Sequence, residues 1–408
     1  MLLCVHFDFG LGASLVTALL YVQHLLGIWH LVRASALAQG LEAAGIPVLL
    51  VSGGMPVPVL DVGAGRFEQL PPLRAADETF KTLVDEAGNA VDDRWKARRR
   101  ERLLTIFDRE RPDIVITELF PFGRRQMRFE IEALLKRARS SRRQGRRPMI
   151  VSSVRDILVP PARAERTDET IAWLRNYYDR VLVHGDQSVI PFERSFSRAA
   201  EIGDLICSTG YVVRSVPSRQ GPGAPGYEEV IVSAGGGAVG EDLIRIAMQA
   251  RSLCGARQRP WRVLVGHNTA ERAFLAHQAA APAGVVVERA RSDFPQLLAN
   301  CALSISQGGY NTVVEVLASR ARALCLPFAE GKESEQTLRC RLLAERGLLQ
   351  LLEQEVPDAE QLAMAVDRAL AAPRNQGRLV DTDGAARAAT ILLELHEQMS
   401  RNLPPPAR

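Results

Sequence analysis

Short apolar segments alternate with longer amphipathic segments along most of the chain. In the first half the apolar runs lack polar–apolar alternation, which indicates strands buried on both faces of a parallel sheet. The stretch 30–44 carries apolar residues at helical spacing and is followed by Gly45 as a C-cap, so this region predicts a βαβ unit. The strands predicted in this half are 19–23, 47–52, 114–118, 149–153 and 181–184.

The segment 215–229 is rich in Pro and Gly, and we interpret it as a linker. The alternation then restarts, with strands predicted at 230–234, 262–266, 284–287, 303–306 and 323–327 and helices at 241–253, 270–280, 311–318, 335–346, 358–371 and 384–399. Two similar halves predict an α/β protein with two Rossmann-like, doubly wound domains that face a central cleft. We expect an N-terminal extension (1–17), a first domain (18–214), the linker, a second domain (230–384), and a C-terminal helix and tail (385–408).

The N-terminal region 9–28 is nearly uncharged and about long enough to cross a bilayer. Gly10, Gly12, Gln23 and His24 interrupt it, however, and a signal peptide would need a basic residue before the apolar stretch, where none stands. We therefore expect a short extension followed by a buried strand, with a membrane segment as the lesser alternative, and a cytoplasmic protein.

Charge and cysteine content exclude several classes of protein. The 408 residues include 51 Lys and Arg against 47 Asp and Glu, a net charge of +4, which does not indicate a nucleic-acid partner. The six cysteines form no CxxC pair, which is typical of buried thiols in a reducing compartment. Two basic stretches, 94–102 and 136–147, are interpreted as solvated helix faces and a loop. For 136–147 the alternative is a patch that holds the protein peripherally at anionic lipid or binds a phosphorylated acceptor.

The motif at 305–315, ISQGGYNTVVE, predicts a strand end, a glycine turn and a helix start. Unpaired N–H groups at a helix start carry partial positive charge and suit a diphosphate, and Glu315 lies where it could accept hydrogen bonds from ribose hydroxyls. A capped helix after a tight turn is the alternative. A second glycine turn at 233–240, SAGGGAVG, is neither a complete dinucleotide fingerprint nor a P-loop, and we expect it to flank the same phosphate site.

A third motif, PFAEGKESEQT at 327–337, follows a predicted strand and opens a helix. Glu335 and Gln336 could bind sugar hydroxyls there, and a capping box with solvated acids is the alternative.

The order of these three motifs resembles the C-terminal half of the family 28 glycosyltransferases of the GT-B fold, which include MurG-type enzymes. The chain most resembles a bacterial group of predicted glycosyltransferases. YVQHLLGIWHLVRASALAQGL (21–41), TELFPFGRRQ (117–126), SVRDIL (153–158) and LVHGD (182–186) look similar to that group as well, so the resemblance covers about 18–395.

The resemblance implies a role for each matching position. The second domain would bind the donor, and the first the acceptor. Glu315 would bind the ribose, and Glu335 and Gln336 would face the donor sugar; well-known members carry two Gln there, so the sugar is left open. The donor diphosphate and its surroundings would fall on Gly236, Gly237, Gln307, Gly308, Gly309, Asn311 and Thr312.

On the acceptor side the family's loop ends in GxGH, whereas this loop has Gly27, Ile28, Trp29 and His30. Trp29 thus replaces a glycine and is expected to close the loop or change its path. His30 is a candidate base, and Glu118 is its rival, with pairing to Arg124 or Arg125 as the structural alternative for Glu118. Three further side chains after strands complete the prediction: Arg155 and His184 line the acceptor side, and His267 lies near the donor or in a surface loop.

Together these observations predict an inverting glycosyltransferase of the hexosyltransferase type. It would move a sugar from a nucleotide-diphosphate sugar, with UDP as the first choice, to a small-molecule, glycan or lipid-linked hydroxyl. No metal cofactor is expected, because no paired acids follow a strand. The alternatives are a sugar-nucleotide epimerase or hydrolase of the same fold, and a nucleotide-sugar-binding protein that lost its acceptor site, which Trp29 motivates.

Overall fold

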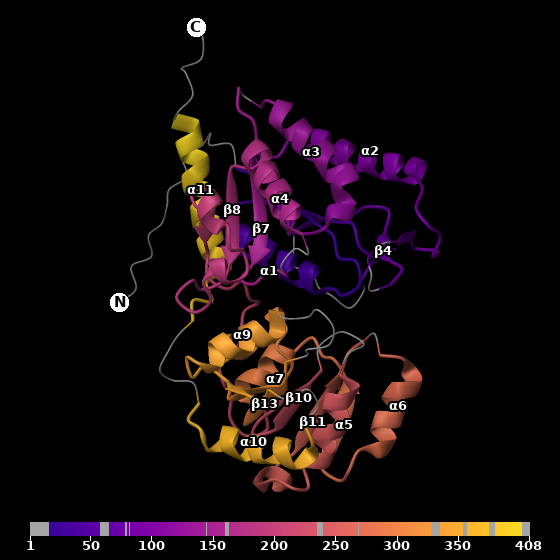
Figure 1. The fold of residues 1–408 in the computed structure, drawn as a ribbon, viewed down its shortest axis with the longest axis vertical. Coiled ribbons are helices and arrows are strands. Elements are labelled where there is room, and N and C mark those ends of the chain that lie inside the picture. The colour runs from indigo at the N-terminus through magenta and orange to yellow at the C-terminus, as the bar shows by residue number, and fades with distance from the viewer. Residues whose placement is uncertain are drawn as a thin grey trace.

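In the computed structural model the chain forms two parallel β-sheets, each covered by helices on both faces (Figure 1). The structure describes residues 16–57, 65–77, 80, 82–143, 145–159, 163–234, 240–267, 269–327, 335–353, 357–374 and 380–401. The predicted α/β class with two Rossmann-like halves is confirmed.

The first sheet has the strand order β3-β2-β1-β6-β7-β8-β9. Its central strands are buried on both faces. In β1, for example, Leu19 and Tyr21 enter one hydrophobic core, and Leu20 and Val22 enter the core on the opposite face. The strands are β1 (Ala18–Val22), β2 (Val48–Ser52), β3 (Arg66–Gln69), β6 (Ile114–Glu118), β7 (Met149–Arg155), β8 (Arg180–His184) and β9 (Ile206–Ser208), with a separate antiparallel pair β4 (Leu73–Ala75) and β5 (Leu83–Asp85).

Helices cover both faces of this sheet. One face packs against α2 (Asp93–Glu110), α3 (Arg128–Ser140) and α4 (Ala164–Tyr177). The other packs against α1 (Trp29–Ala43) and α11 (Gly384–Arg401). Short 3-10 turns lie at Arg125–Met127, Phe192–Arg194 and Ala199–Ile202.

The second sheet has the order β12-β11-β10-β13-β14-β15. Its strands are β10 (Val230–Ser233), β11 (Trp261–Val265), β12 (Val285–Arg289), β13 (Leu303–Ser306), β14 (Ala323–Cys325) and β15 (Gln350–Leu351). One face packs against α5 (Glu241–Ala250) and α10 (Ala359–Ala371), and the other against α7 (Phe294–Asn300), α8 (Tyr310–Ala318) and α9 (Glu335–Ala344). Helix α6 (Glu271–Ala280) lies beside β12, and a 3-10 turn spans Gly255–Gln258.

The chain returns from the second half to the first, where the last helix, α11, packs on the first sheet (Figure 1). It packs against α1 so closely that a Cβ on Gly40 would lie 2.3 Å from the Cβ of Ala385. Helix α1 is therefore enclosed between the sheet and α11, which explains why so few of its positions are polar. The region 385–401, which the sequence places in a unit of its own, covers the first sheet in the structure.

The segment between the sheets is held in place by one buried side chain. Asn300 accepts from the Gln220 N–H (2.7 Å) and donates to the Pro225 carbonyl (2.8 Å). Gly226 has φ +77°, and a Cβ there would lie 2.8 Å from the Leu297 backbone, so only glycine fits the turn. The Pro- and Gly-rich stretch is thus a packed connection among the described residues.

Candidate active site

The topology brings the carboxyl ends of four strands to the junction between the halves. In each sheet the strand order reverses between two central strands, β1 and β6 in the first and β10 and β13 in the second. Ligands of such sheets bind beyond the carboxyl ends at this reversal. His30 follows β1, Glu118 ends β6, and Gly308 and Gly309 follow β13, so the predicted residues of both halves gather at the two reversals.

His30 and Glu118 form a hydrogen-bonded pair. His30 lies in the first turn of α1, and its Nδ1 is 3.0 Å from Glu118 Oε1. Arg33, one turn further along α1, donates to the same oxygen. Because a carboxylate accepts, the neutral imidazole carries its proton on Nδ1, and Nε2 presents a lone pair with no partner among the described residues. The two candidate bases of the sequence are therefore parts of one arrangement.

The charge states of this pair follow from its surroundings. Burial works to raise the pKa of Glu118, but Arg33 and the hydrogen bonds from His30 and Ser153 outweigh it and lower that pKa to about 2. Burial and the nearby charge of Arg124 lower the pKa of His30 to about 3, against the hydrogen bond to Glu118. Near neutral pH the site thus holds a carboxylate beside a neutral imidazole.

The prediction that Glu118 pairs with Arg124 or Arg125 is wrong. Arg124 donates to the Gln23 carbonyl (2.8 Å), and Arg125 donates to the Arg166 carbonyl (2.8 Å). The cation beside Glu118 is Arg33, because the start of α1 lies over the end of the neighbouring strand.

A chain of hydrogen bonds continues behind Glu118. Ser153 Oγ lies 2.7 Å from Glu118 Oε2 and 2.9 Å from His184 Nε2, and His184 Nδ1 lies 2.8 Å from Thr209 Oγ1. His184 is fully buried, and its burial lowers its pKa to about 3. The structure thus places His184 behind the His30–Glu118 pair, where its side chain supports that pair through Ser153.

The two glycines of the turn before α8 have different surroundings. A Cβ on Gly308 would lie 2.5 Å from Cys340 Sγ, so α9 leaves no room there, and the Gly308 N–H donates to Gln336 Oε1 (3.0 Å). A Cβ on Gly309 would meet nothing within 4 Å. Val313 makes the first backbone bond of α8, to the Gly309 carbonyl, so the N–H groups of 310–312 have no partner within the helix. The first turn of α8 retains the properties of an anion site, while Gln336 already occupies one N–H of the turn.

The first turn of α8 also touches the first half of the molecule. Asn311 Nδ2 donates to the Trp29 carbonyl (3.1 Å), and the Tyr310 hydroxyl donates to the His184 carbonyl (2.9 Å). Arg33 and Arg339 lie over the Tyr310 ring, with guanidinium-to-centroid distances of 5.1 and 5.6 Å. A single hydrogen bond therefore connects the predicted phosphate turn to Trp29, the residue directly before the candidate base His30.

Arg339 joins the two halves through a buried ion-pair network. It donates to both carboxylate oxygens of Asp156 (2.8 and 3.2 Å), to Glu335 Oε1 (2.7 Å) and to the Gly308 carbonyl (2.9 Å). Arg155 also pairs with Glu335. The predicted sugar-facing Glu335 is thus a buried acid between two arginines, and the alternative of a solvated capping acid is wrong.

Glu315 is buried in α8 and pairs with Arg214 (2.8 Å). Burial raises the pKa of Glu315, and Arg214 opposes this rise. The predicted ribose acid therefore has a cation partner from the segment that connects the two sheets.

The remaining predicted residues have varied positions. Trp29 is the first residue of α1, its side chain is 37% exposed, and it does not adopt positive φ, so the loop accommodates the bulky ring by starting the helix there. Gly27 lies just before it, and a Cβ there would lie 3.3 Å from the Trp29 ring. Thr312 is buried, Gln307 is half-buried, and His267 is exposed after β11. Gly236 and Gly237 lie outside the described residues.

Sequence reasoning missed two arginines that organise the site. Arg33 is the sole Lys, Arg, Asp or Glu between Asp8 and Glu42, and a lone charge within a buried helix requires a buried partner, which was the available signal. Arg339 lies four residues after Glu335 in α9, at the spacing of an ion pair. The interpretation of 94–102 as a solvated face is also wrong for Arg99, which is fully buried and pairs with Glu130 (2.8 Å).

Two further properties concern metals and membranes. Among the described residues no group of three His, Cys, Asp or Glu side chains is placed to hold a metal ion. Within the same residues, every helix is too short or too polar to cross a bilayer.

Comparison with known families identifies the second half of the chain. Residues 233–390 match the Glycosyltransferase family 28 C-terminal domain, a stretch that runs from the end of β10 into α11. This part of the chain is therefore similar to the family 28 glycosyltransferase C-terminal domain, and the resemblance predicted from its motifs is confirmed.

The chain has a curated relative in Chromobacterium violaceum, a UDP-N-acetylglucosamine--N-acetylmuramyl-(pentapeptide) pyrophosphoryl-undecaprenol N-acetylglucosamine transferase. The two are 27% identical over 226 residues, which cover 52% of this chain and 60% of that protein. The chain thus spans about three fifths of the relative's length.

Solved glycosyltransferases share the whole architecture. The calicheamicin glycosyltransferase CalG4 has a TM-score of 0.60 and 16% identity, and covers 95% of this chain and 100% of its own. SsfS6 from Streptomyces sp. SF2575, solved with thymidine diphosphate, has a TM-score of 0.56 and 16% identity, and covers 94% of this chain and 99% of its own. These likenesses assign the two sheets to the GT-B fold.

Proposed function

We propose that the protein is an inverting, metal-independent glycosyltransferase that moves a hexosyl group from a nucleotide-diphosphate sugar to a hydroxyl acceptor. The observation that carries the proposal is the hydrogen bond from Asn311 to the Trp29 carbonyl. It joins the first turn of α8, suited to a diphosphate, to the first turn of α1, which holds His30 paired with Glu118. A proton acceptor and an anion site at one junction are what displacement at an anomeric carbon requires.

In the proposed reaction the acceptor oxygen attacks the anomeric carbon opposite the leaving group. The bond from that carbon to the phosphate oxygen breaks, and the diphosphate leaves with the electron pair. The hydroxyl proton passes to His30 Nε2. Glu118 stabilises the resulting imidazolium through Nδ1, and the N–H groups of 310–312 stabilise the diphosphate charge that a metal ion balances in other enzymes.

The nucleotide is the first point to test. UDP is supported by the name of the Chromobacterium violaceum relative, whereas SsfS6 was solved with thymidine diphosphate. We propose a UDP-sugar donor whose ribose hydroxyls displace Arg214 from Glu315. A thermal-shift panel of UDP, GDP, TDP and their sugars should show that UDP stabilises the protein and does so much less in Glu315→Ala. The exposed Glu345→Ala is the matched control. Equal stabilisation by UDP in both variants would count against the donor site.

Turnover separates transfer from the related reactions. Incubation with the stabilising nucleotide sugar alone should release little nucleoside diphosphate, and addition of an acceptor should increase the release of nucleoside diphosphate. Turnover without an acceptor would instead indicate an epimerase or a hydrolase. Binding without any turnover, across acceptors that include lipid-linked glycans, would indicate a binding protein.

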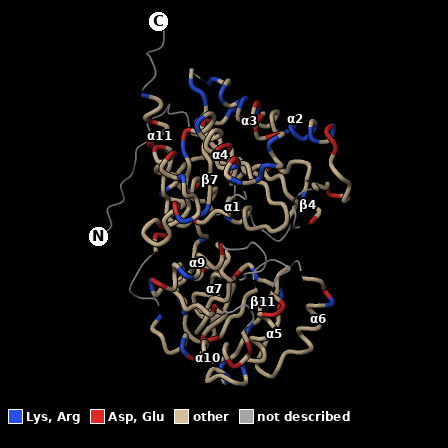
Figure 2. The backbone as a smooth tube through the Cα atoms, viewed as in Figure 1, with Lys and Arg blue, Asp and Glu red and all other residues tan. Residues whose placement is uncertain are grey.

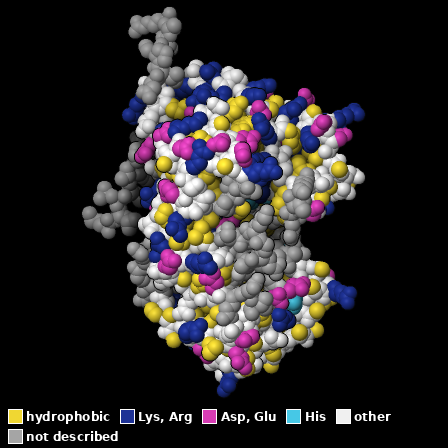
Figure 3. Space-filling model, in the orientation of Figure 1, with side chains coloured by type: hydrophobic (Ala, Val, Ile, Leu, Met, Phe, Trp, Pro, Cys, Tyr) yellow, Lys and Arg dark blue, Asp and Glu magenta, His cyan; other side chains and the backbone are white. Residues whose placement is uncertain are grey.

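We extend the proposal to the basic segment 136–147, whose contact with anionic lipid would hold the protein at a membrane surface and near a lipid-linked acceptor. Figure 2 shows basic and acidic residues interspersed along α2 and α3, and Figure 3 shows both kinds of side chain on this face of the first half. Lys136 pairs with Glu132, and Arg137 with Asp108, so part of the charge of the segment is neutralised. Retention on vesicles that contain phosphatidylglycerol, lost as NaCl rises, is the expected result.

A further inference from the structure

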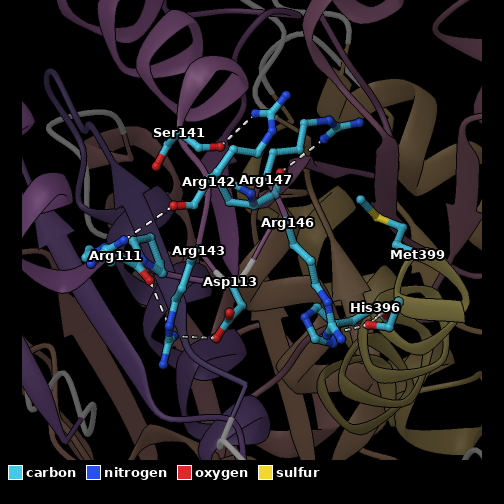
Figure 4. A pocket seen from close by; sticks show the side chains of 13 residues that line it. Arg111, Asp113, Ser141, Arg142, Arg143, Arg146, Arg147, His396 and Met399 are labelled. Atoms are coloured by element: carbon cyan, nitrogen blue, oxygen red, sulfur yellow. Dashed lines mark hydrogen bonds and ion pairs between the residues drawn. The ribbon is translucent and has the colours of Figure 1, made fainter. Parts of the chain in front are cut away.

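A cavity of about 240 Å³ opens at the amino-terminal ends of strands of the first sheet, opposite the ends that hold His30 and Glu118 (Figure 4). Three parts of the chain far apart in the sequence line it: 111–113 before β6, residues 141–143 and 145–148 before β7, and the last turns of α11. Asp113 and Glu118 lie at the two ends of β6, so the cavity is about 15 Å along the strand from the candidate active site. A ligand there would not compete with a donor or acceptor.

The lining of this cavity has a large excess of positive charge. Five arginines and His396 face it, against one acid, Asp113. Arg143 pairs with Asp113 (3.1 Å), and Arg147 pairs with Asp179 through both oxygens (2.6 and 2.7 Å). These two pairs compensate two of the five guanidinium groups.

The other three guanidinium groups bond to neutral oxygens. Arg111 donates to the Arg142 carbonyl (3.3 Å), Arg142 to the carbonyls of Arg139 and Ser141 (2.8 and 2.7 Å), and Arg146 to Ser400 Oγ (2.8 Å). Figure 4 shows these side chains around the cavity, with Arg146 beside His396. Among the described residues none of the three has a carboxylate within ion-pair distance, so three positive charges line the cavity without compensation, and Figure 4 shows their guanidinium groups on different sides of it.

We propose that this cavity binds a phosphate-bearing anion, attracted by the uncompensated charges of Arg111, Arg142 and Arg146. The planar forks of guanidinium groups match phosphate oxygens and can bind them in pairs. The volume is below the usual range for drug-sized ligands, which favours a phosphate or diphosphate group over a whole nucleotide sugar. The bound anion would join the end of α11 to the loop before β7.

The test uses inorganic phosphate and pyrophosphate as probes on the full chain, at constant ionic strength set with chloride. Either probe should raise the Tm by about 2–4 °C at ten times its Kd. The shift should persist with saturating UDP and in the control Arg98→Gln, which removes an exposed arginine of α2. It should disappear in the double variant Arg111→Gln/Arg146→Gln. A shift of equal size in the double variant would overturn the proposal.

A second variant guards against a folding defect in the first. Ser400→Glu places a carboxylate beside Arg146, so it should fold and should abolish the phosphate-induced shift. A shift that survives in a folded Ser400→Glu protein would overturn the proposal as well. Both variants leave α8 intact, so UDP stabilisation reports separately on the proposed transferase site.

Vesicles distinguish the source of the phosphate. If retention on phosphatidylglycerol vesicles is displaced by pyrophosphate and lost in the double variant, the group is a lipid headgroup. If phosphate raises the Tm of the unmodified protein but not of the double variant, and the double variant still binds the vesicles, the ligand of the cavity is a soluble anion.

Discussion

The imidazole of His30 shows how much a single side chain depends on its neighbours. Burial and Arg124 keep it neutral, and Glu118 fixes the proton on Nδ1. When Nε2 takes a proton during transfer, the adjacent carboxylate stabilises the new charge. The low pKa in the free protein keeps the ring in the unprotonated form near neutral pH, when the acceptor arrives.

This argument predicts the pH dependence of the reaction. The base must be neutral, so activity is lost as the pH falls through the pKa of His30, about 3, and kcat/KM should show no acidic limb from His30 between pH 5 and 8. Removal of the Arg124 charge in Arg124→Gln should raise that pKa and move the limb upward. His30→Gln should lower kcat by about 10²–10⁴-fold. Initial rates across pH 4–9 measure both effects.

The neighbouring Arg125→Gln is the control for this profile, because Arg125 bonds to the Arg166 carbonyl. Identical acidic limbs in the two arginine variants would contradict the role given to Arg124.

The paired glycines of the turn before α8 predict opposite outcomes for the same substitution. Gly308→Ala should destabilise the fold by about 1–3 kcal/mol, because its methyl group would meet Cys340 and the Gln336 backbone. Gly309→Ala should leave the stability almost unchanged, since φ −63° suits alanine and the space is open. The same methyl group would hinder the approach of a diphosphate, so UDP affinity should fall about tenfold or more. Denaturant unfolding and nucleotide titration measure the two effects, and full UDP affinity in Gly309→Ala would contradict the proposed site.

At the scale of elements, the central strands could be predicted from the sequence. Each of the ten predicted strands has a counterpart whose ends lie within two residues. All of these strands except the edge strand β12 are largely buried on both faces, so their sequences are mostly apolar. Of the five strands missed among the described residues, β3, β9 and β15 lie at sheet edges, where one side is solvated and the apolar signal weakens, and β4 and β5 form a separate short pair. Helices α4 and α7 also had no prediction, and the seven residues of α7 are too few to show a period.

The residues of the candidate site that lie in sequence motifs could be predicted. The glycine turn, His30, Glu118 and Glu335 were found because each follows a strand or opens a helix. Arg33 and Arg214 could not be predicted in the same way, because each comes from another element and meets its acid, Glu118 or Glu315, only after the elements assemble. Arg339 lies four residues after Glu335 in α9, but its pair with Asp156 of the other half likewise forms only on assembly.

Helix α9 gives the element-scale prediction. Arg339→Met removes the cation beside Asp156, which is fully buried, and an uncompensated buried carboxylate costs about 3–5 kcal/mol of unfolding free energy. Arg341→Met, two residues away, removes an exposed ion pair with Glu353 and should cost at most about 1 kcal/mol. Denaturant unfolding of the two variants measures the difference. Similar losses in both would mean that the Arg339 network does not stabilise the junction.

At the scale of the whole molecule, the junction is held by polar contacts. The Tyr310 hydroxyl, Asn311 and Arg339 all reach from the second half to the first. Polar groups that are buried on assembly must stay in one charge state, so the stability of the molecule depends on pH.

Among the described residues, three histidines with strongly lowered pKa values dominate that dependence. Burial, as the largest cause for each, lowers the pKa to about 4 for His24 and to about 3 for His30 and His184. The unfolded chain binds these protons below about pH 6.5 while the folded chain does not, so the free energy of unfolding falls as the pH drops from 6.5. Between pH 6.5 and 5.5 the three together should cost about 3 kcal/mol. Below pH 4.5 the low pKa of Glu118 adds a further loss.

Denaturant unfolding at pH 7.5, 6.5 and 5.5 measures this dependence. A loss of about 1 kcal/mol is expected in the first step and of about 3 kcal/mol in the second. His184→Asn removes one of the three buried groups, so the loss between pH 6.5 and 5.5 should shrink by about one third. His267→Asn, at an exposed position, should leave it unchanged. If the His184 variant kept the full loss, proton uptake by the buried histidines could not be the cause of acid instability, and the charge states assigned to the His30–Glu118 pair would need revision.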